Sequence, residues 1–374
     1  MKAPFKFGEV VSGEHFTNRN DEIKTLHHNF SSLQNTIIIS PRRYGKSSLV
    51  KEAADRFTRK EKSCYFSFFD LMSVYSEEEF YSQFATRILK ATSSRVDEFI
   101  QLAKNLVKGT RIIIHSGTGE PSLEFGLSYV KDNVQHILNL PQVIASKKKK
   151  KIIVCIDEFQ NISRFAQSDK LQGRLRSVWQ YHQDVGYLLY GSKHTMMREI
   201  FQKTGSPFYR FGEIIYLKRI HEKYLKEHVQ SAFQSTGKTI SDVICHRISE
   251  TVENHPYYLQ QFARNIWQIS GKRVRETDFE EAKQSLISEN LNFYNELLEG
   301  LTNYQVRLLR ALLNEEKHLY SSEILNGYKL GSTANIKRII EGLMKKGIII
   351  KEDNTLIFTD PVFKLIAQQR FLSQ

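Results

Sequence analysis

The chain has 374 residues, of which 40% are hydrophobic and 25% are charged. This composition excludes a disordered or fibrous protein, and the length is too great for one ordinary core, so two or three domains are expected. No stretch of about 18 consecutive apolar residues occurs in the sequence, which argues against a membrane span and against a membrane partner. The formal net charge of +13 favours polyanionic partners such as nucleotides or nucleic acid, although charge alone does not choose between them.

The cysteines indicate the compartment. Cys64, Cys155 and Cys245 are scattered along the chain and show no metal-ligand spacing. An odd, dispersed set argues against a disulfide framework and favours a reducing compartment. The start of the sequence also lacks the apolar core and the cleavage site of a signal peptide. We therefore expect a cytoplasmic protein.

The chain up to about residue 218 alternates short apolar runs with helical stretches. The apolar runs predict strands at 36–40, 64–70, 152–157, 187–191 and 213–217, and the periodicity between them predicts helices such as 46–59 and 172–183. Runs that are apolar throughout favour a parallel sheet with helices on both faces, and the βαβ alternation predicts an α/β domain. Segments 111–115 and 122–127 flank a glycine-rich turn and predict an inserted hairpin.

The rest of the chain has two further patterns. Residues 221–298 are helical with few strand-like runs, whereas helices at 303–313 and 332–346 precede short strands at 347–351 and 355–358. Helices followed by a small β-ribbon outline a winged helix-turn-helix. We therefore predict a core domain at 1–218, a helical domain at 219–298 and a winged helix at 299–374.

A phosphate-binding loop is predicted at Ser40–Ser48 (SPRRYGKSS), where an apolar strand ends and a helix begins. Gly45 lets the backbone approach the phosphates, Lys46 reaches the β- and γ-phosphates, and the Ser47 hydroxyl ligates Mg²⁺. Ser40 stands where the pattern has its first Gly, so a basic loop that only caps a helix stays open as an alternative. The other loop residues expected to contact the nucleotide are Pro41, Arg42, Arg43, Tyr44 and Ser48.

A second motif, Lys151–Glu158 (KIIVCIDE), is an apolar strand that ends in two acids. Such a strand can place Asp157 beside the Mg²⁺ held by Ser47, and Glu158 can then polarise the attacking water as a general base. A solvated acidic turn is the plain alternative. Both motifs lie at the carboxyl ends of strands and in the order that an ATP site requires, which favours ATP with Mg²⁺ as the ligand.

Together with these two motifs, further segments resemble the archaeal-type ATPases of the STAND branch of the AAA+ superfamily, over about residues 16–366. Phe16–Ile23 is similar to the opening F-x-G/N-R-x-x-E-I/L box of that family. Ser40–Leu49 is similar to its phosphate-binding loop, in which the first Gly is often replaced. Tyr190–Lys193 resembles the G-S motif at the end of its fourth strand.

Two later segments extend the resemblance with small departures. Ser206–Arg210 resembles the S-P-L-Y-G-R segment, although Phe211 follows where the spacing of the family often differs. Asn254–Gln260 is similar to the G-H-P-Y-Y-L-Q motif of the helical lid, with Asn254 in place of Gly. The resemblance implies an α/β, AAA+-like P-loop fold with strand order 5-1-4-3-2, a helical lid over the nucleotide and a C-terminal winged helix.

The resemblance also implies roles for single residues. Arg19 would border the adenine, and Ser192 would sense the γ-phosphate. Independently of the resemblance, Arg210 is a candidate arginine finger for the γ-phosphate of a neighbouring subunit. His255 and Pro256 of the lid would contact the nucleotide. The residues themselves allow plainer readings, namely a helix cap for Ser192, a surface ion pair for Arg210 and an ordinary helix start for His255-Pro256.

The winged helix leaves DNA binding open. Polar and basic residues at Gly331–Arg338 suit a recognition helix in a major groove, and Lys345-Lys346 add positive charge. Glu341 and Glu352-Asp353 oppose that attraction. A winged helix also serves in some proteins as a protein-interaction module, because a fold does not fix a function.

We therefore predict a Mg²⁺-dependent ATPase, slow without a partner, that works as a molecular switch in signalling, regulation or defence. ATP would draw the lid onto the core, and hydrolysis or exchange would reposition the winged helix. Two alternatives are a DNA-binding AAA+ ATPase of the initiator or loader type, and a nucleotide-binding scaffold with little turnover. The expected partners are ATP and ADP, with DNA, a protein partner or a second copy of the chain as further candidates.

Overall fold

The computed structural model describes residues 3–107, 111–115, 117–125, 127–352 and 355–372, with the side chains of 127–132 left aside. The chain divides into two compact units, which are described separately. Arg19–Pro41 and Lys46–Leu217 form the sheet unit, and the described residues of Met1–Asn18, Arg42–Gly45 and Lys218–Gln374 form the helical unit. Among the described helices, none is long and apolar enough to cross a membrane.

The sheet unit is built on a five-stranded sheet. Its strands are β1 (Thr36–Ile39), β2 (Cys64–Asp70), β5 (Lys151–Asp157), β6 (Val185–Gly191) and β7 (Glu213–Tyr216). They lie in the order β2-β5-β6-β1-β7, and every neighbouring pair is parallel. Numbered along the chain, the five core strands have the order 5-1-4-3-2, so the predicted fold class is confirmed.

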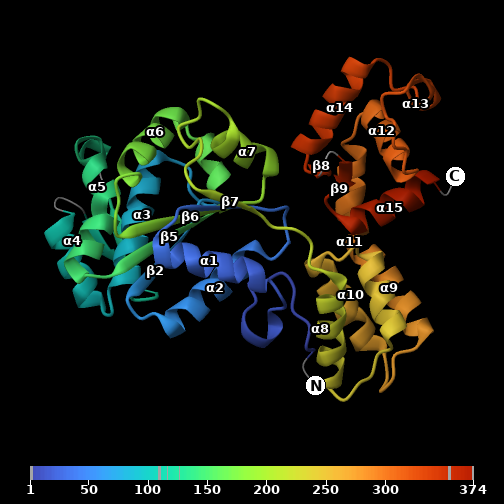
Figure 1. Cartoon of the computed structure of the whole chain (residues 1–374), viewed down its shortest axis with the longest axis horizontal. Helices are drawn as coiled ribbons and strands as arrows, with labels where there is room; N and C mark the ends of the chain where they lie inside the picture. The colour runs from blue at the N-terminus through green and yellow to red at the C-terminus, as the bar shows by residue number, and fades with distance from the viewer. Residues whose placement is uncertain (1–2, 108–110, 116, 126, 353–354, 373–374) are drawn as a thin grey trace. The chain divides into compact units, whose positions relative to one another are not determined.

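Helices cover both faces of this sheet (Figure 1). One face carries α1 (Asn20–Ser32) and α2 (Lys46–Lys60), and the other carries α3 (Glu77–Thr92), α5 (Leu127–Lys148) and α6 (Ser168–Trp179). The same unit contains α4 (Val96–Leu106), α7 (His194–Gln202) and the 3-10 helix η2 (Phe159–Arg164). Because water reaches neither face of the central strands, β1 and β6 are buried at every position, as their apolar runs predict.

Aromatic packing explains where α6 ends. The prediction of a helix at 172–183 was wrong by about one turn, since α6 spans Ser168–Trp179. Trp179 is buried at the last position and stacks on Tyr187 of β6, with ring centroids 4.2 Å apart. Phe84 of α3 stacks on the same indole at 5.9 Å. This contact between three elements fixes the end of the helix more strongly than local periodicity does.

The predicted hairpin is confirmed as β3 (Arg111–Ile114) and β4 (Pro121–Glu124), which pair antiparallel. Its second strand ends earlier than predicted, because α5 already begins at Leu127; Gly126 lies outside the described residues. β4 is attached to α3 through side chains. The backbone N–H of Leu123 donates to Thr86 Oγ1 at 2.9 Å, and Ser82 Oγ donates to the Leu123 carbonyl.

The helical unit contains a helical segment and a winged helix. The segment consists of α8 (Glu222–Gln234), α9 (Asp242–Thr251), α10 (Pro256–Ile269) and α11 (Glu276–Glu299). The winged helix consists of α12 (Asn303–Leu313), α13 (Ser322–Gly327), α14 (Thr333–Lys345), β8 (Ile349–Glu352), β9 (Thr355–Phe358) and α15 (Pro361–Leu372). The antiparallel pair β8–β9 after α14 confirms the predicted ribbon. The domain boundaries after residues 218 and 298 stay a prediction.

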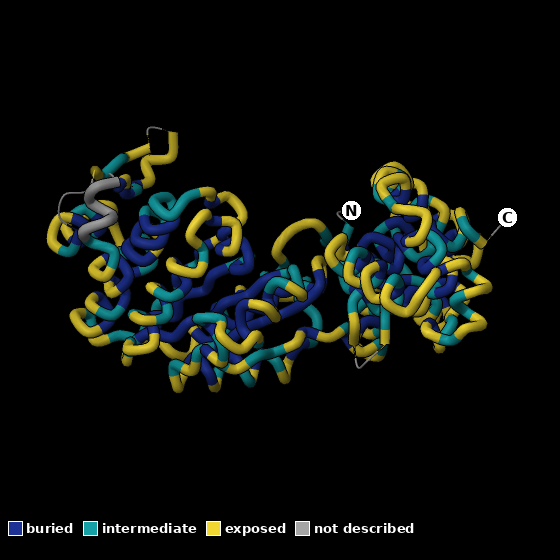
Figure 2. The backbone as a smooth tube through the Cα atoms, turned by 90° about the horizontal axis from the view of Figure 1, so that it is seen from above, coloured by how far each residue is buried: buried dark blue, intermediate teal, exposed yellow. Residues whose placement is uncertain are grey.

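The helical unit has one continuous apolar core. In Figure 2 the backbone of buried residues is coloured dark blue. The core includes residues from α8 through α15 and Phe5 from the N-terminal segment. Phe5 packs on Phe233 of α8, and Phe7 meets Tyr257 of α10 edge to face. The N-terminal segment is therefore held by the helices that follow residue 218.

A close backbone contact before β7 yields a stability prediction. A Cβ added to Gly212 would lie 2.2 Å from the carbonyl oxygen of Asn35, whereas a Cβ added to Gly173 on α6 would meet nothing within 4 Å. We expect Gly212→Ala to destabilise the protein by about 1–3 kcal/mol, because backbone must shift to admit the methyl group. Gly173→Ala should stabilise it by up to about 1 kcal/mol through helix propensity. Thermal unfolding of both variants is the measurement, and an unchanged midpoint for Gly212→Ala would contradict the packing.

Candidate nucleotide site

The parallel sheet brings three strand ends to one edge. β6 lies between β1 and β5, so the segments that follow Ile39, Asp157 and Gly191 leave the sheet side by side. Loops at the carboxyl ends of parallel strands are the usual place for ligands in open α/β sheets. The segment after β1 is the predicted phosphate-binding loop, the one after β5 contains Glu158, and the one after β6 contains Ser192.

The backbone of the loop has the curvature that a phosphate cradle needs. Arg43 and Gly45 have positive φ angles of 64° and 81°, and α2 begins directly afterwards at Lys46. A Cβ added to Gly45 would meet no atom within 4 Å, so the space at this position is open. Backbone N–H groups of such a turn, together with a helix N-terminus, favour an anion.

Lys46 lies beside the two acids at the end of β5. Its side chain is only 8% exposed, and Nζ donates to Asp157 Oδ1 and, at 3.1 Å, to Glu158 Oε1. The ammonium group also lies 4.9 Å from the ring centroid of Tyr190 on β6. A buried cation is stable only when it is paired, and here both carboxylates neutralise it.

Ser47 and Asp157 fit the requirements of Mg²⁺. Ser47 Oγ donates to Asp157 Oδ2 at 2.7 Å, so a hydroxyl oxygen and a carboxylate oxygen already lie together. Mg²⁺ prefers oxygen ligands and usually completes its shell with waters and substrate phosphates rather than with a full protein cage. Two protein oxygens beside a phosphate-binding loop therefore suit a Mg²⁺–nucleotide complex.

Glu158 is held at both carboxylate oxygens. Oε1 accepts from Lys46, whereas Oε2 accepts from Ser192 Oγ at 2.9 Å and from the side-chain amide of Gln160. Burial raises the pKa of Glu158, but Lys46, Gln160 and Ser192 outweigh this effect, so that the pKa lies below its usual value. The carboxylate is thus ionised and able to accept a proton.

The tip of the loop, Arg42–Gly45, packs within the helical unit. Arg43 donates to the Tyr258 hydroxyl at 2.7 Å, and its guanidinium lies 4.6 Å from the ring centroid of Tyr257. Asp360, just before α15, lies 4.0 Å from Arg43 and accepts hydrogen bonds from the hydroxyls of Tyr258 and Tyr294. Its other oxygen caps the first N–H groups of α15.

Tyr44 provides a second connection at the loop tip. It is buried, its ring meets His255 at a centroid distance of 4.9 Å, and its hydroxyl accepts from Arg219 at 3.2 Å. Arg219 also donates to Glu253 at 2.7 Å and to the carbonyl of Phe358 on β9. Two short polar paths therefore connect the loop tip with the winged helix, one through Asp360 and one through Arg219.

The remaining predicted site residues have other surroundings. Arg19 is buried at the start of α1 and pairs with Glu22 at 2.9 Å. Arg210 is exposed and lies over the ring of Tyr209. Pro256 is the first residue of α10, and His255 before it is buried against Tyr44. Among the loop residues, Pro41 and Ser48 are buried and Arg42 is exposed.

Sequence reasoning did not single out Gln160, Asp70, Arg219 or Asp360. Gln160 is a polar residue directly after an Asp-Glu-Phe run, and the structure buries it completely. Asp70 ends β2 opposite Asp157, and burial together with the charges of Asp157 and Glu158 raises its pKa. An acid directly before a proline, as in Asp360-Pro361, is typical of a helix start. This pattern could have predicted α15 and the N-cap role of Asp360.

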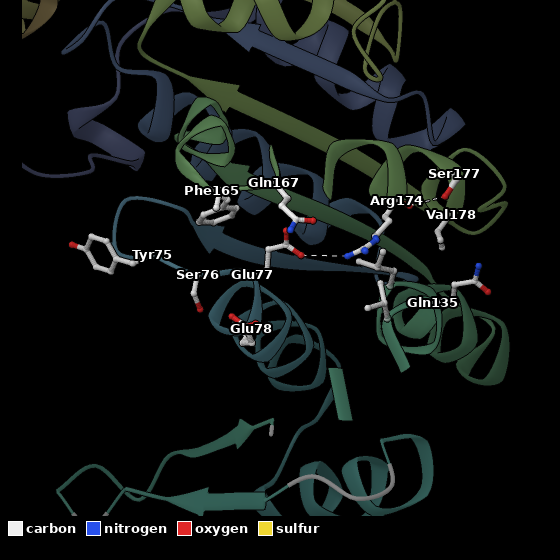
Figure 3. A pocket seen from close by; sticks show the side chains of 13 residues that line it. Tyr75, Ser76, Glu77, Glu78, Gln135, Phe165, Gln167, Arg174, Ser177 and Val178 are labelled. Carbon is white, nitrogen blue, oxygen red and sulfur yellow. Dashed lines mark hydrogen bonds and ion pairs between the residues drawn. The ribbon is translucent and has the colours of Figure 1, made fainter. Parts of the chain in front are cut away.

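A separate pocket lies on the sheet unit between the start of α3, α5 and α6 (Figure 3). Its volume is about 660 Å³, and its lining includes Phe165, Leu138 and Val178. Glu77 and Arg174, which both line it, form an ion pair at 3.4 Å, and Tyr75, another lining residue, is 78% exposed. None of the residues selected from the sequence lines this pocket.

Comparison with known families agrees with this geometry. The family described as "ATPase domain predominantly from Archaea" matches residues 16–262, which is more than half of the chain. The chain belongs to this ATPase family. A second family, described as "Probable winged helix domain", matches residues 292–369 of the ATPase. A search of curated proteins found no match.

Solved structures share the fold of this ATPase. The Walker-type ATPase paby2304 of Pyrococcus abyssi is 17% identical, with a TM-score of 0.71 over 98% of this chain and 99% of the other. The ORC2 protein of Aeropyrum pernix, solved as ADPNP-ADP complexes, is 15% identical, with a TM-score of 0.58 over 95% of each chain. Its ADP form is 14% identical, with a TM-score of 0.55 over 96% and 97%. At these identities the likeness shows the fold alone.

The buried His255 leads to a prediction about pH. Burial, with the nearby positive charges of Arg219 and Arg43, lowers its pKa to about 3. Because an unfolded histidine titrates near about 6.5, the unfolded state takes up a proton first, and stability falls as the pH drops from about 6.5 toward 3. We expect thermal midpoints at pH 7 and pH 5 to differ less in His255→Gln than in the wild type. The exposed His318→Gln should behave as the wild type, and equal pH dependence in all three proteins would contradict the prediction.

Proposed function

We propose that this chain is a Mg²⁺-dependent ATPase of the STAND branch that works as a nucleotide-driven switch. The observation that carries the proposal is the meeting of Lys46 and Ser47 at the start of α2 with Asp157 and Glu158 at the end of β5. A cation for phosphates, two oxygens for Mg²⁺ and an ionised carboxylate are the parts that ATP hydrolysis needs. The ORC2 protein of similar fold is described with ADPNP and ADP, which adds support for a nucleotide ligand.

Each residue has one task in this proposal. Lys46 leaves the two carboxylates and pairs with the β- and γ-phosphates, and the backbone of Pro41–Gly45 with Ser48 encloses them. Ser47 and Asp157 hold Mg²⁺, which neutralises charge on the phosphates. Glu158 accepts the proton of the attacking water. Ser192 acts through its hydrogen bond to Glu158, and Arg19 borders the base.

Hydrolysis and binding are separable by substitution. Lys46→Ala should lose ATP affinity, because the pocket then lacks its phosphate cation, whereas Glu158→Gln should bind ATP and turn over at least about tenfold more slowly. Calorimetry with Mg²⁺ measures ATP binding, and phosphate release measures turnover. Arg210→Ala is a separate test of action in trans: if Arg210 of one chain acts on ATP bound by another, the substitution should reduce turnover at high protein concentration and have little effect at low concentration. Absence of nucleotide binding by the wild type would contradict the proposal. Binding without turnover would favour a nucleotide-binding scaffold instead.

The proposed switch is based on two ion pairs of the phosphate-binding loop, one made by Lys46 and one made by Arg43. Lys46 is neutralised by acids of the sheet unit, whereas Arg43 is neutralised by Asp360 of the winged helix. Phosphates compete for both cations, because each is more attracted to a nearby polyanion than to a single carboxylate. Nucleotide would therefore weaken the Arg43–Asp360 contact while the helical segment, residues 219–298, closes as a lid. The winged helix, residues 299–374, would be repositioned at the same time.

Removal of the Asp360 charge tests this coupling. Asp360→Asn keeps an oxygen to cap α15 but no longer neutralises Arg43, so the resting arrangement is weakened. By linkage, we expect ATP to bind about fivefold to thirtyfold more tightly, which corresponds to roughly 1–2 kcal/mol. Asp242→Asn is a matched control, since that acid of the same unit pairs only with Lys226 at 2.8 Å among the contacts described. Unchanged ATP affinity in Asp360→Asn would remove the coupling from the proposal.

DNA binding is the second candidate function, and one observation favours it. Lys337 and Arg338 on α14 and Lys351 on β8 are exposed, and no ion pair of theirs is found among the described residues. Such cations on a winged helix can pair with phosphates of DNA. An initiator or loader of this type would bind duplex DNA with an affinity that falls steeply with salt and depends on nucleotide.

The surroundings of the cysteines support a cytoplasmic location in this proposal. Cys64, Cys155 and Cys245 are free and buried. Burial raises the pKa of Cys64 and of Cys245 to about 12, so both thiols stay protonated and unreactive. Such cysteines suit a reducing compartment.

A further inference from the structure

Gln160 is a buried polar residue in contact with Glu158, and the proposed ATPase mechanism gives it no task. Its side chain is 0% exposed, and its amide nitrogen donates to Glu158 Oε2. Within the described part of the chain, its amide oxygen has no hydrogen-bond partner. Buried polar atoms are rarely left unsatisfied, and exceptions concentrate at functional sites.

The local backbone directs this side chain back to Glu158. Glu158 has a left-handed conformation, with φ 49° and ψ 40°, and forms the N-cap of η2. The N–H of Asn161 bonds to the Glu158 carbonyl at 2.9 Å and closes the turn. Phe159 points into the core against Phe201 and Phe208, which fixes the orientation of the turn. This turn therefore places the side-chain amide of Gln160 against the Glu158 carboxylate.

The neighbouring strand leaves room for the amide. A Cβ added to Gly191 would lie 2.0 Å from Gln160 Oε1 and 2.7 Å from Met197 Sδ. Only a residue without a side chain at position 191 permits this placement of Gln160. Ser192, the next residue, donates to the same oxygen of Glu158 at 2.9 Å. The end of β6 thus acts on Glu158 in two ways. Ser192 donates a hydrogen bond to it, and Gly191 leaves space for the Gln160 side chain that also binds it.

These contacts distinguish the two oxygens of Glu158. Oε2 accepts from two uncharged donors that belong to the sheet unit, whereas Oε1 accepts only from Lys46 among the contacts described. Lys46 is the residue assigned to the phosphates, so its departure frees Oε1 and leaves Oε2 held. A base whose orientation is fixed in advance needs no reorganisation during the reaction.

We propose that Gln160 is a positioning residue which, with Ser192, holds Oε2 of Glu158 so that Oε1 receives the proton of the attacking water. In this step the water oxygen bonds to the γ-phosphorus and the bond to the β,γ-bridging oxygen breaks. ADP leaves with that electron pair, and the proton passes to Oε1. The inference rests on the proposed ATPase function.

The alternative is that Gln160 only stabilises a buried turn. Both readings allow Gln160→Met to change thermal stability, because methionine has a similar volume but no donor. They differ in catalysis. A positioning role requires a loss of kcat that depends on the carboxylate of Glu158, whereas a structural role does not.

A double-mutant cycle separates the two readings. We expect Gln160→Met to lower kcat at least about tenfold with the Kd for ATP changed less than about twofold. In a Glu158→Gln background the same substitution should cost less than about a further twofold, because no base is left to position. Gln172→Met is the matched control, since Gln172 is also a buried glutamine whose amide donates to a side-chain hydroxyl, that of Ser168 at 2.8 Å. It should leave kcat unchanged.

Gly191→Ala supplies an independent route to the same effect. The added methyl group would displace the Gln160 amide, so kcat should fall in the same way without any change at position 160. A wild-type kcat in Gln160→Met, or an equal loss with and without the Glu158 carboxylate, overturns the inference while the ATPase function stands. If Gln160→Met does not fold, the Gly191→Ala result decides. A wild-type protein without ATP turnover would instead remove the proposed function, and the inference with it.

Discussion

The candidate site depends on the neutralisation of the buried ammonium group of Lys46. An ammonium group that is 8% exposed is costly by several kcal/mol unless charges of opposite sign surround it. The parallel sheet meets that need because β5 ends two strands away from β1 and delivers Asp157 and Glu158 to the same edge. The same carboxylates that balance the lysine are those suited to Mg²⁺ and to proton transfer, so one electrostatic requirement organises the site.

The phosphate-binding loop belongs to both units of the chain. Lys46 and Ser47 interact with acids of the sheet unit, whereas Arg43 and Tyr44 interact with Tyr258, His255, Arg219 and Asp360 of the helical unit. Only a few residues of continuous backbone separate these two sets of contacts. In the proposed switch, a ligand that rearranges the loop would alter both sets of contacts.

Much of the fold and part of the site could be predicted from the sequence. β2 and α12 have the predicted bounds, because continuous apolar runs and a Thr302 capping box leave few alternatives. The sequence predicts that Ser47 and Asp157 lie together with Glu158 beside them, because both motifs follow apolar strands of one parallel sheet, and their side chains are in contact in the structure. Gln160 and Asp360 were missed because their partners are fixed only by tertiary packing, and α6 was misplaced because Trp179 packs on Tyr187 from another element.

Hydrogen–deuterium exchange with and without ATP and Mg²⁺ reports on nucleotide binding and on the start of α15 in one experiment. We expect slower exchange at the amides of Gly45–Ser48, to which the phosphates would bind, and faster exchange at Val362 and Phe363, whose N–H groups are capped by Asp360 at 3.0 Å. The α8 amides, remote in sequence from both, should change little. Slower exchange in the loop without any change at the start of α15 would contradict the coupling, and no change at either place would contradict nucleotide binding itself.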